Sequence, residues 1–164
     1  MDNEQLIDAV GAALIAVISP HYYEDERGFQ GAFYAQLHYR LQEMVLPEGA
    51  MLREEYQKKL SQHRLRIRPD IILHEPFDPA RHLGRDDGNH AVIELKRHAI
   101  TRTAKEALES LVAMIEALNY PLGVFINVDS TRTWSELVPE AFRTQIVCLA
   151  ISLDESGAPR LMRD

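Results

Sequence analysis

Apolar residues recur at steps of three and four positions in three stretches of the chain, a spacing typical of helices with one buried face. The first stretch ends before Pro20, the second covers residues 27–45 and is closed by Pro47 and Gly49, and the third follows Thr101. The apolar positions are Leu6, Ile7, Val10, Leu14 and Val17; Phe29, Phe33, Leu37 and Leu41; and Ala104, Leu108, Leu111, Ile115 and Leu118. The pattern predicts three amphipathic helices.

Between the second and third helices the apolar spacing changes to the short runs typical of strands. Residues 51–60 predict a first strand, Leu65 and Ile67 together with residues 71–73 a second, and residues 91–95 a third. Residues 74–90 are rich in Pro, Gly and Asp and predict a long irregular connection.

Two further apolar runs, residues 122–128 and 145–153, predict strands after the third helix, with a short helix at 135–142 between them. No internal repeat or Gly/Ser linker divides the 164 residues, so we expect residues 1–164 to form one domain. The order helix, three strands, helix, strand, with an added N-terminal helix and C-terminal strand, predicts an α/β fold with a mixed central sheet flanked by helices.

Two acidic residues and a lysine accompany the second and third predicted strands. Asp70 follows Pro69 at the start of one, and Glu94 and Lys96 end the other with Leu95 between them. Side chains alternate along a strand, so Glu94 and Lys96 share a face, and hairpin pairing would place Asp70 across from Glu94. Two carboxylates suit Mg²⁺, which can activate water for attack on a phosphodiester, and a nearby lysine can orient that water.

These residues resemble the motif of the PD-(D/E)xK nuclease superfamily, and residues 27–128 match its restriction-endonuclease-like αβββαβ core in predicted element order. The resemblance implies a metal-dependent nuclease acting on phosphodiester bonds, most simply in DNA. It makes Asp70 and Glu94 ligands of Mg²⁺, with Mn²⁺ as a substitute, and assigns Lys96 to the attacking water. The alternative is a nuclease fold with little or no catalysis that serves to bind nucleic acid or protein.

The sequence departs from the family pattern in two helices. Many members supply another acid from the helix before the strands, where this chain offers Gln30, with Glu26 just ahead of it. Glu54 and Glu55 on the first strand are further candidates. Some members carry a Gln and a Tyr in the later helix, where this chain has Lys105, Glu109 and Ser110.

The densest basic stretch includes Arg64, Arg66 and Arg68, which in an extended strand share the face leading to Asp70. They are candidates for binding nucleic-acid phosphates, or they pair with acids across the hairpin. Seven histidines are present without zinc-ligand spacing. His82, His90 and His98 flank the proposed site; His98 could assist it, or all three are ordinary loop and surface histidines.

The net charge of −7 argues against strong binding of nucleic acid by this domain alone. Nucleic acid could then be bound with the help of a second copy, as a homodimer, or of a partner protein. The single cysteine, Cys148, excludes a disulfide framework. The apolar run at residues 9–18 is too short to span a bilayer and follows acidic residues, unlike a secretory signal. We therefore expect a cytoplasmic protein with no membrane association.

Overall fold

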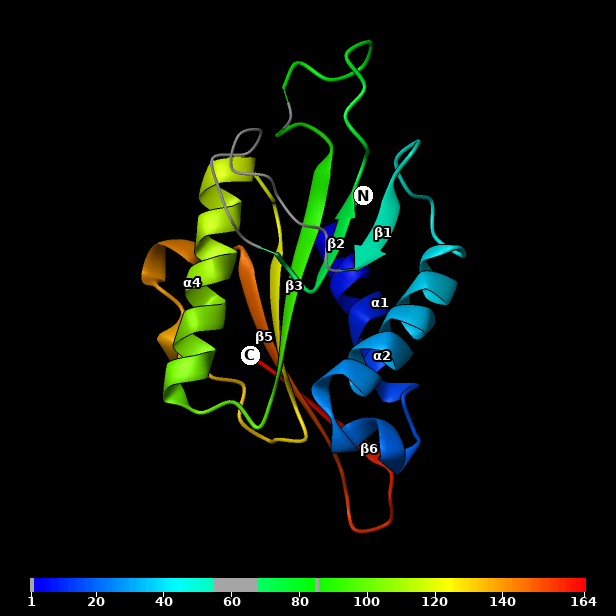
Figure 1. Cartoon of the computed structure of the whole chain (residues 1–164), viewed down its shortest axis with the longest axis vertical. Coiled ribbons are helices and arrows are strands. Elements are labelled where there is room, and N and C mark those ends of the chain that lie inside the picture. The colour runs from blue at the N-terminus through cyan, green and yellow to red at the C-terminus, as the bar shows by residue number, and fades with distance from the viewer. Residues whose placement is uncertain (1, 55–67, 85) are drawn as a thin grey trace.

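A six-stranded mixed sheet forms the centre of the protein, with its strands in sequence order from β1 to β6 (Figure 1). The computed structural model describes residues 2–54, 68–84 and 86–164. The strands are β1 (Met51–Glu54), β2 (Ile71–His74), β3 (Asn89–Arg97), β4 (Gly123–Val128), β5 (Ile146–Leu153) and β6 (Pro159–Arg163). Strands β3, β4 and β5 are parallel to one another, and β1, β2 and β6 complete the two sides through antiparallel pairs.

Helices cover both faces of this sheet. On one face lie α1 (Asn3–Ile15) and α2 (Glu26–Leu41), joined through a 3₁₀ turn at Pro20–Glu24, and on the other lies α4 (Thr101–Leu118) (Figure 1). Two 3₁₀ turns, Ser135–Leu137 and Glu140–Phe142, connect β4 to β5. The order α2, β1, β2, β3, α4, β4 is the αβββαβ order expected of a restriction-endonuclease-like fold.

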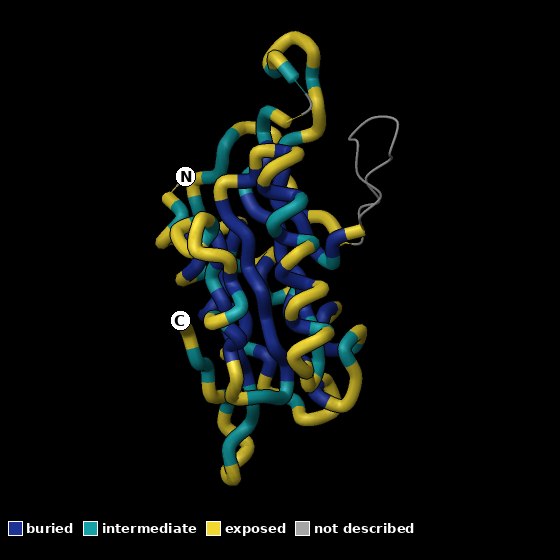
Figure 2. Tube along the Cα trace, turned by 90° about the vertical axis from the view of Figure 1, so that its left-hand side faces the viewer, coloured by how far each residue is buried: buried dark blue, intermediate teal, exposed yellow. Residues whose placement is uncertain are grey.

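The two faces of the sheet bury two separate apolar cores, so alternate residues of a strand enter different cores. Ile93 and Leu95 of β3 pack toward α1 and α2, whereas Val92 packs beneath α4. The strands appear as the buried layer between exposed helices in Figure 2. This alternation directs the side chain of Glu94 to the α4 side, as its position between Ile93 and Leu95 predicts.

Several predicted boundaries need correction. Helix α2 ends at Leu41 rather than at residue 45, because the next residues form tight turns in which the N–H of Glu43 bonds the oxygen of Arg40. The helix predicted at 135–142 is two 3₁₀ turns separated by Pro139. Of the first predicted strand the structure describes Met51–Glu54, and Leu65 and Ile67 lie outside the described residues.

Strand β6 was not predicted. Its residues Pro159–Arg163 are only partly buried, because β6 is an outer strand that pairs with β5 alone within the described sheet. Such a strand has no continuous apolar run for a sequence pattern to detect. Separately, none of the helices in the described ranges is long and apolar enough to cross a bilayer.

Candidate functional site

The candidate site lies where β2 and β3 separate. Ile71, the first residue of β2, pairs with Ile93 of β3, so Asp70, one residue before β2, lies across from Glu94. The carboxylate of Asp70 accepts a hydrogen bond from the backbone N–H of Leu95 at 2.7 Å. The side chain of Asp70 thus extends the contact between β2 and β3 beyond their last backbone pair. The antiparallel register places Asp70 opposite Glu94, as the predicted hairpin requires.

Glu94 is buried under α4, with only 6% of its surface exposed. The hydroxyl of Ser110, on the inner face of α4, donates a hydrogen bond of 3.1 Å to Glu94 Oε1. A buried carboxyl without such a partner would be strongly destabilising. Ser110 therefore fixes the carboxyl of Glu94 toward the end of β3.

The ammonium group of Lys96 lies among oxygen atoms at the same end of β3. Its Nζ is 2.6 Å from the carbonyl oxygen of Leu95, to which it donates, and 3.8 Å from Oδ2 of Asp70. A third contact, of 3.3 Å, joins Nζ to Oε1 of Glu26. The three residues of the predicted motif are therefore brought together, with Lys96 placed against Asp70.

Glu26 joins this group from the first turn of α2. Asp25 caps the helix by accepting a hydrogen bond from the N–H of Gly28 at 2.6 Å, which starts α2 at Glu26. The second oxygen of Glu26 accepts the N–H of Arg97 at 2.8 Å. Glu26, one turn before the predicted candidate Gln30, is therefore the acid that α2 brings to this group.

The acids of the site resist ionisation. Burial raises the pKa of Asp70, although the N–H of Leu95 and the charge of Lys96 partly oppose this. Burial, reinforced by the charge of Asp70, raises the pKa of Glu94 to about 8. The site thus holds more potential negative charge than it can stabilise by itself.

The pKa of Lys96 is raised, whereas burial alone lowers the pKa of a lysine. Burial alone would lower it, but three neighbouring carboxylates raise it above its ordinary value. Those carboxylates belong to Asp70, Glu26 and Glu94. Lys96 therefore stays protonated at neutral pH and acts as a hydrogen-bond donor and positive charge, not as a base.

These donors fit the magnesium ion that the family resemblance implies. When the three carboxylates are ionised, Lys96 leaves two negative charges uncompensated, the charge of one divalent cation. Mg²⁺ is commonly held by one or two carboxylates and keeps several waters. Asp70 and Glu94 would supply these ligands. Within the described residues no three His, Cys, Asp or Glu side chains are grouped as a ready-made metal cage.

The other predicted site residues have different outcomes. Gln30 is buried and donates from Nε2 to the backbone oxygen of Asp70 at 3.4 Å, so it supports that residue and adds no acid. Arg68 is exposed and, with Arg27 and the predicted candidate Glu54, lines a hollow of about 390 Å³ beside Gln30. Arg64, Arg66 and Glu55 lie outside the described residues.

Ser110 departs from the residue types of the family pattern, but its hydroxyl donates directly to Glu94. Its neighbours Lys105 and Glu109 lie on the exposed side of α4 and pair with each other at 3.8 Å. The helical spacing could have placed Ser110 on the side of α4 that faces the sheet, because Ser110 is adjacent to buried Leu111 and three residues beyond buried Ala107.

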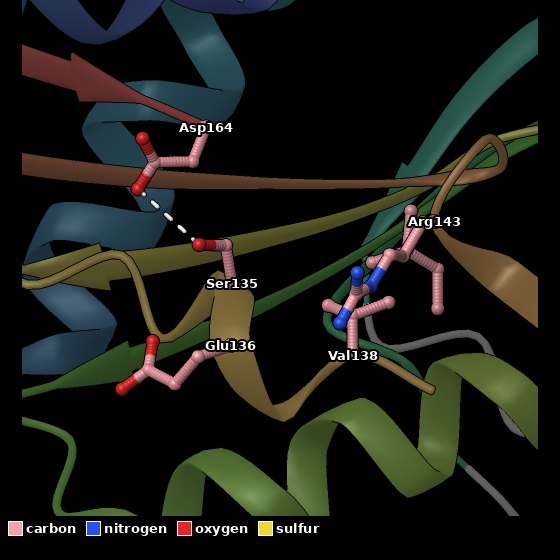
Figure 3. Close-up of a pocket in the computed structure, with 6 residues that line it drawn as sticks. Ser135, Glu136, Val138, Arg143 and Asp164 are labelled. Carbon is pink, nitrogen blue, oxygen red and sulfur yellow. Dashed lines mark hydrogen bonds between the residues drawn. The ribbon is translucent and has the colours of Figure 1, made fainter. Parts of the chain in front are cut away.

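A separate pocket of about 380 Å³ lies between the connection from β4 to β5 and the end of β6 (Figure 3). Ser135, Glu136, Arg143 and Asp164 are among its lining residues, and the Ser135 hydroxyl donates to Asp164 at 3.3 Å. It contains none of the predicted site residues. The hydroxyls of Thr133 and Ser135 donate to Asp164, and Glu136 accepts a hydrogen bond from Arg132 at 2.7 Å, so both acids are already engaged and the pocket offers no catalytic grouping of its own.

Comparisons with known proteins assign no family to this chain: no family model matches it, and no curated protein matches it. Among solved structures, NucC of P. aeruginosa ATCC27853 in its cAAA-bound form is similar, with 12% sequence identity and a TM-score of 0.40. The alignment covers 100% of this chain and 85% of that one. Because a likeness this distant carries no argument about function, the assignment of the α/β fold rests on the chain's own element order and strand pairing.

Proposed function

We propose that this protein is a metal-dependent nuclease that hydrolyses phosphodiester bonds in DNA. The observation that carries the proposal is the convergence of Asp70 and Glu94 at the divergence of β2 and β3, with the ammonium of Lys96 3.8 Å from Asp70. Buried carboxyl pairs with raised pKa values are costly, and they concentrate at sites that bind cations or transfer protons.

Each residue has a role that follows from its surroundings. Asp70 and Glu94 hold Mg²⁺ or Mn²⁺, which when bound supplies Lewis-acid activation of water and of the phosphate. Ser110 keeps the Glu94 carboxyl oriented. Lys96, protonated because of its carboxylate neighbours, donates to the attacking water and stabilises negative charge that develops on the phosphate oxygens.

Arg68 and Arg27 extend the proposed site toward a nucleic-acid backbone. Both line the same hollow beside Gln30, whose amide contacts Asp70. Guanidinium groups bind phosphates by two parallel hydrogen bonds. Arg68 therefore retains its proposed role in phosphate binding, and Arg64 and Arg66 remain proposals from sequence.

Cleavage of supercoiled plasmid and of single-stranded DNA, with Mg²⁺ or Mn²⁺, tests the proposal. Asp70→Ala and Lys96→Ala should each reduce the rate by ~10²-fold or more, as expected for loss of a positioned charge at a reacting centre. Lys105→Ala is the matched control, because Lys105 is an exposed lysine of α4 paired with Glu109. It should cut at the wild-type rate.

One combination of results would contradict the nuclease proposal. If the wild-type protein cuts neither substrate with either metal, and millimolar metal leaves its melting temperature unchanged, the nuclease proposal is wrong. The fold would then serve as a binding module, which a filter-binding or gel-shift assay with the same DNA would detect.

A further inference from the structure

A second polar pair, His98 and Asp129, lies beside the carboxylate site. His98 is the first residue after β3 and Asp129 the first after β4. Because β3 and β4 are parallel neighbours, both residues emerge at the same edge of the sheet. His98 Nε2 lies 2.7 Å from Asp129 Oδ2, which makes the pair a directly bonded imidazole and carboxylate.

Both residues adopt a backbone conformation that is unfavourable for a residue with a Cβ atom. The φ angles are 50° at His98 and 56° at Asp129, in the left-handed region. The N–H of His98 bonds the oxygen of Val128 at 3.0 Å, which holds the two turns together. Strained residues of this kind concentrate at active sites, where the surrounding fold maintains them.

Direct contacts link the pair to the candidate site. Arg97 Nη2 lies 3.0 Å from the same Asp129 oxygen that binds His98. The backbone N–H of Arg97 donates to Glu26, whose other oxygen binds Lys96. His98 is two positions beyond Lys96, so the Cα atoms of the two residues are at most about 7 Å apart.

The proposed hydrolysis needs a proton donor that the carboxylate site does not supply. The leaving oxygen of a phosphodiester becomes an alkoxide unless it is protonated, and a positioned acid accelerates that step. Lys96 Nζ is already engaged by the carbonyl oxygen of Leu95 at 2.6 Å and by Glu26 Oε1 at 3.3 Å, and it is assigned to the attacking water. In-line displacement places the leaving oxygen on the side of the phosphorus opposite the attacking water. The proton donor must therefore lie apart from Lys96, which is assigned to the attacking water. A side chain further along the chain at the same end of β3 meets this requirement.

We propose that His98, positioned by Asp129, is the general acid that protonates the leaving oxygen in the proposed nuclease reaction. The inference rests on the proposed function. The side chain of His98 is 54% exposed, so substrate can reach it. With Nε2 bound to Asp129, Nδ1 is the ring nitrogen left to meet substrate, and the carboxylate orients the imidazole, as a carboxylate does in other catalytic dyads.

Hydrolysis with His98 as the acid forms one bond to phosphorus and breaks another. The oxygen of the attacking water forms a bond to phosphorus, and the bond from phosphorus to the leaving oxygen breaks with its electron pair on that oxygen. The imidazolium of His98 gives its Nδ1 proton to the leaving oxygen and becomes neutral. The attacking water releases one proton to solvent, and His98 regains a proton from solvent.

Two substrates that differ in their leaving group test the inference. DNA releases an alkoxide that requires a proton, whereas a p-nitrophenyl ester of thymidine 5′-phosphate releases a phenolate that does not. The variant His98→Asn removes the imidazole but keeps a residue that tolerates the left-handed backbone. Control His21→Asn alters a histidine that is exposed and pairs with Glu24 within its own 3₁₀ turn.

We expect His98→Asn to lose ~10²-fold or more of the rate on DNA, in the range of general acid catalysis, and less than about 3-fold on the nitrophenyl ester. Asp129→Asn should show the same selectivity with a smaller loss, and its rate on the ester should stay at wild type. Equal losses on both substrates, or no loss on DNA, would overturn the inference while leaving the nuclease proposal standing. A wild-type protein inactive on both substrates would overturn the proposed function and the inference with it.

Discussion

The buried carboxyl of Glu94 makes the stability of this protein depend on pH in a direction opposite to that of a salt-bridged acid. Its pKa is about 8 in the folded protein and 4.5 as the ordinary value. As pH rises above 4.5 the unfolded chain loses this proton while the folded protein keeps it, so folding becomes less favourable. The loss of stability is complete only above pH 8, where both states are ionised.

The magnitude follows from the shift. Each pKa unit corresponds to 1.36 kcal/mol, so the difference between 4.5 and about 8 destabilises the ionised folded protein by up to about 5 kcal/mol. About 3 to 4 kcal/mol of this falls between pH 5 and pH 8. Replacing Glu94 with Gln removes the titration and keeps an oxygen that accepts the hydrogen bond from Ser110. Glu94→Gln should therefore match the wild type near pH 5 and exceed its stability by several kcal/mol at pH 8.

Urea unfolding followed by circular dichroism at pH 5, 6, 7, 8 and 9 measures this difference directly. Glu109→Gln is the control, because Glu109 is an exposed acid on the same helix as Ser110 and its removal should leave the slope with pH unchanged. Parallel curves for wild type and Glu94→Gln across this range would refute the reasoning. They would mean that Glu94 is ionised in the folded protein without cost.

Magnesium adds a second arm to the same experiment. Binding to the ionised carboxylates stabilises the folded state by ~2.7 kcal/mol at a metal concentration of 100 times Kd. Mg²⁺ should therefore flatten the pH dependence of the wild type and leave that of Glu94→Gln almost unaltered. An equal response of both proteins would show that the metal binds away from Glu94.

Two further variants examine the residues that support the site. Ser110→Ala removes the hydrogen bond to Glu94 and should weaken Mg²⁺ binding about tenfold in a calorimetric titration, because hydrogen bonds to charged groups contribute ~1.5–3 kcal/mol; an unchanged Kd would contradict a role for Ser110. Glu26→Ala removes the acceptor of the Arg97 N–H and one partner of Lys96, and should lower the free energy of unfolding by ~1–3 kcal/mol. The same variant should slow DNA cleavage, and a wild-type rate would show that Lys96 is positioned without Glu26.

Much of the fold could be predicted because its apolar spacing is regular. Helices α1, α2 and α4 each bury one face, which gives apolar residues at steps of three and four positions. Strands β3, β4 and β5 are largely buried, which gives short apolar runs. The proximity of Asp70 and Glu94 follows from one assumption, that β2 and β3 pair as a hairpin, and the register confirms it. Partly buried β6 lacks such a period.

The supporting residues of the site were harder to predict, because their contacts join distant parts of the chain. Glu26 lies 70 residues before Lys96, and only the packing of α2 on the sheet brings the two together. A helix position suggested Gln30 as the residue nearest the strands, and it does touch Asp70, but through its amide and the backbone. The acid comes instead from the capped first turn, where Asp25 determines which residue starts the helix.

The outer strand β6 of the described sheet affects how copies of this protein can associate. It begins with Pro159, which has no N–H to donate, and it carries Arg160 and Arg163. Short strands, proline and positive charge at a sheet edge discourage the addition of a strand from another molecule. The β6 edge of the described sheet is therefore protected against the addition of a strand, and we expect any homodimer to form without a sheet continued from the β6 strand of one copy to that of the next.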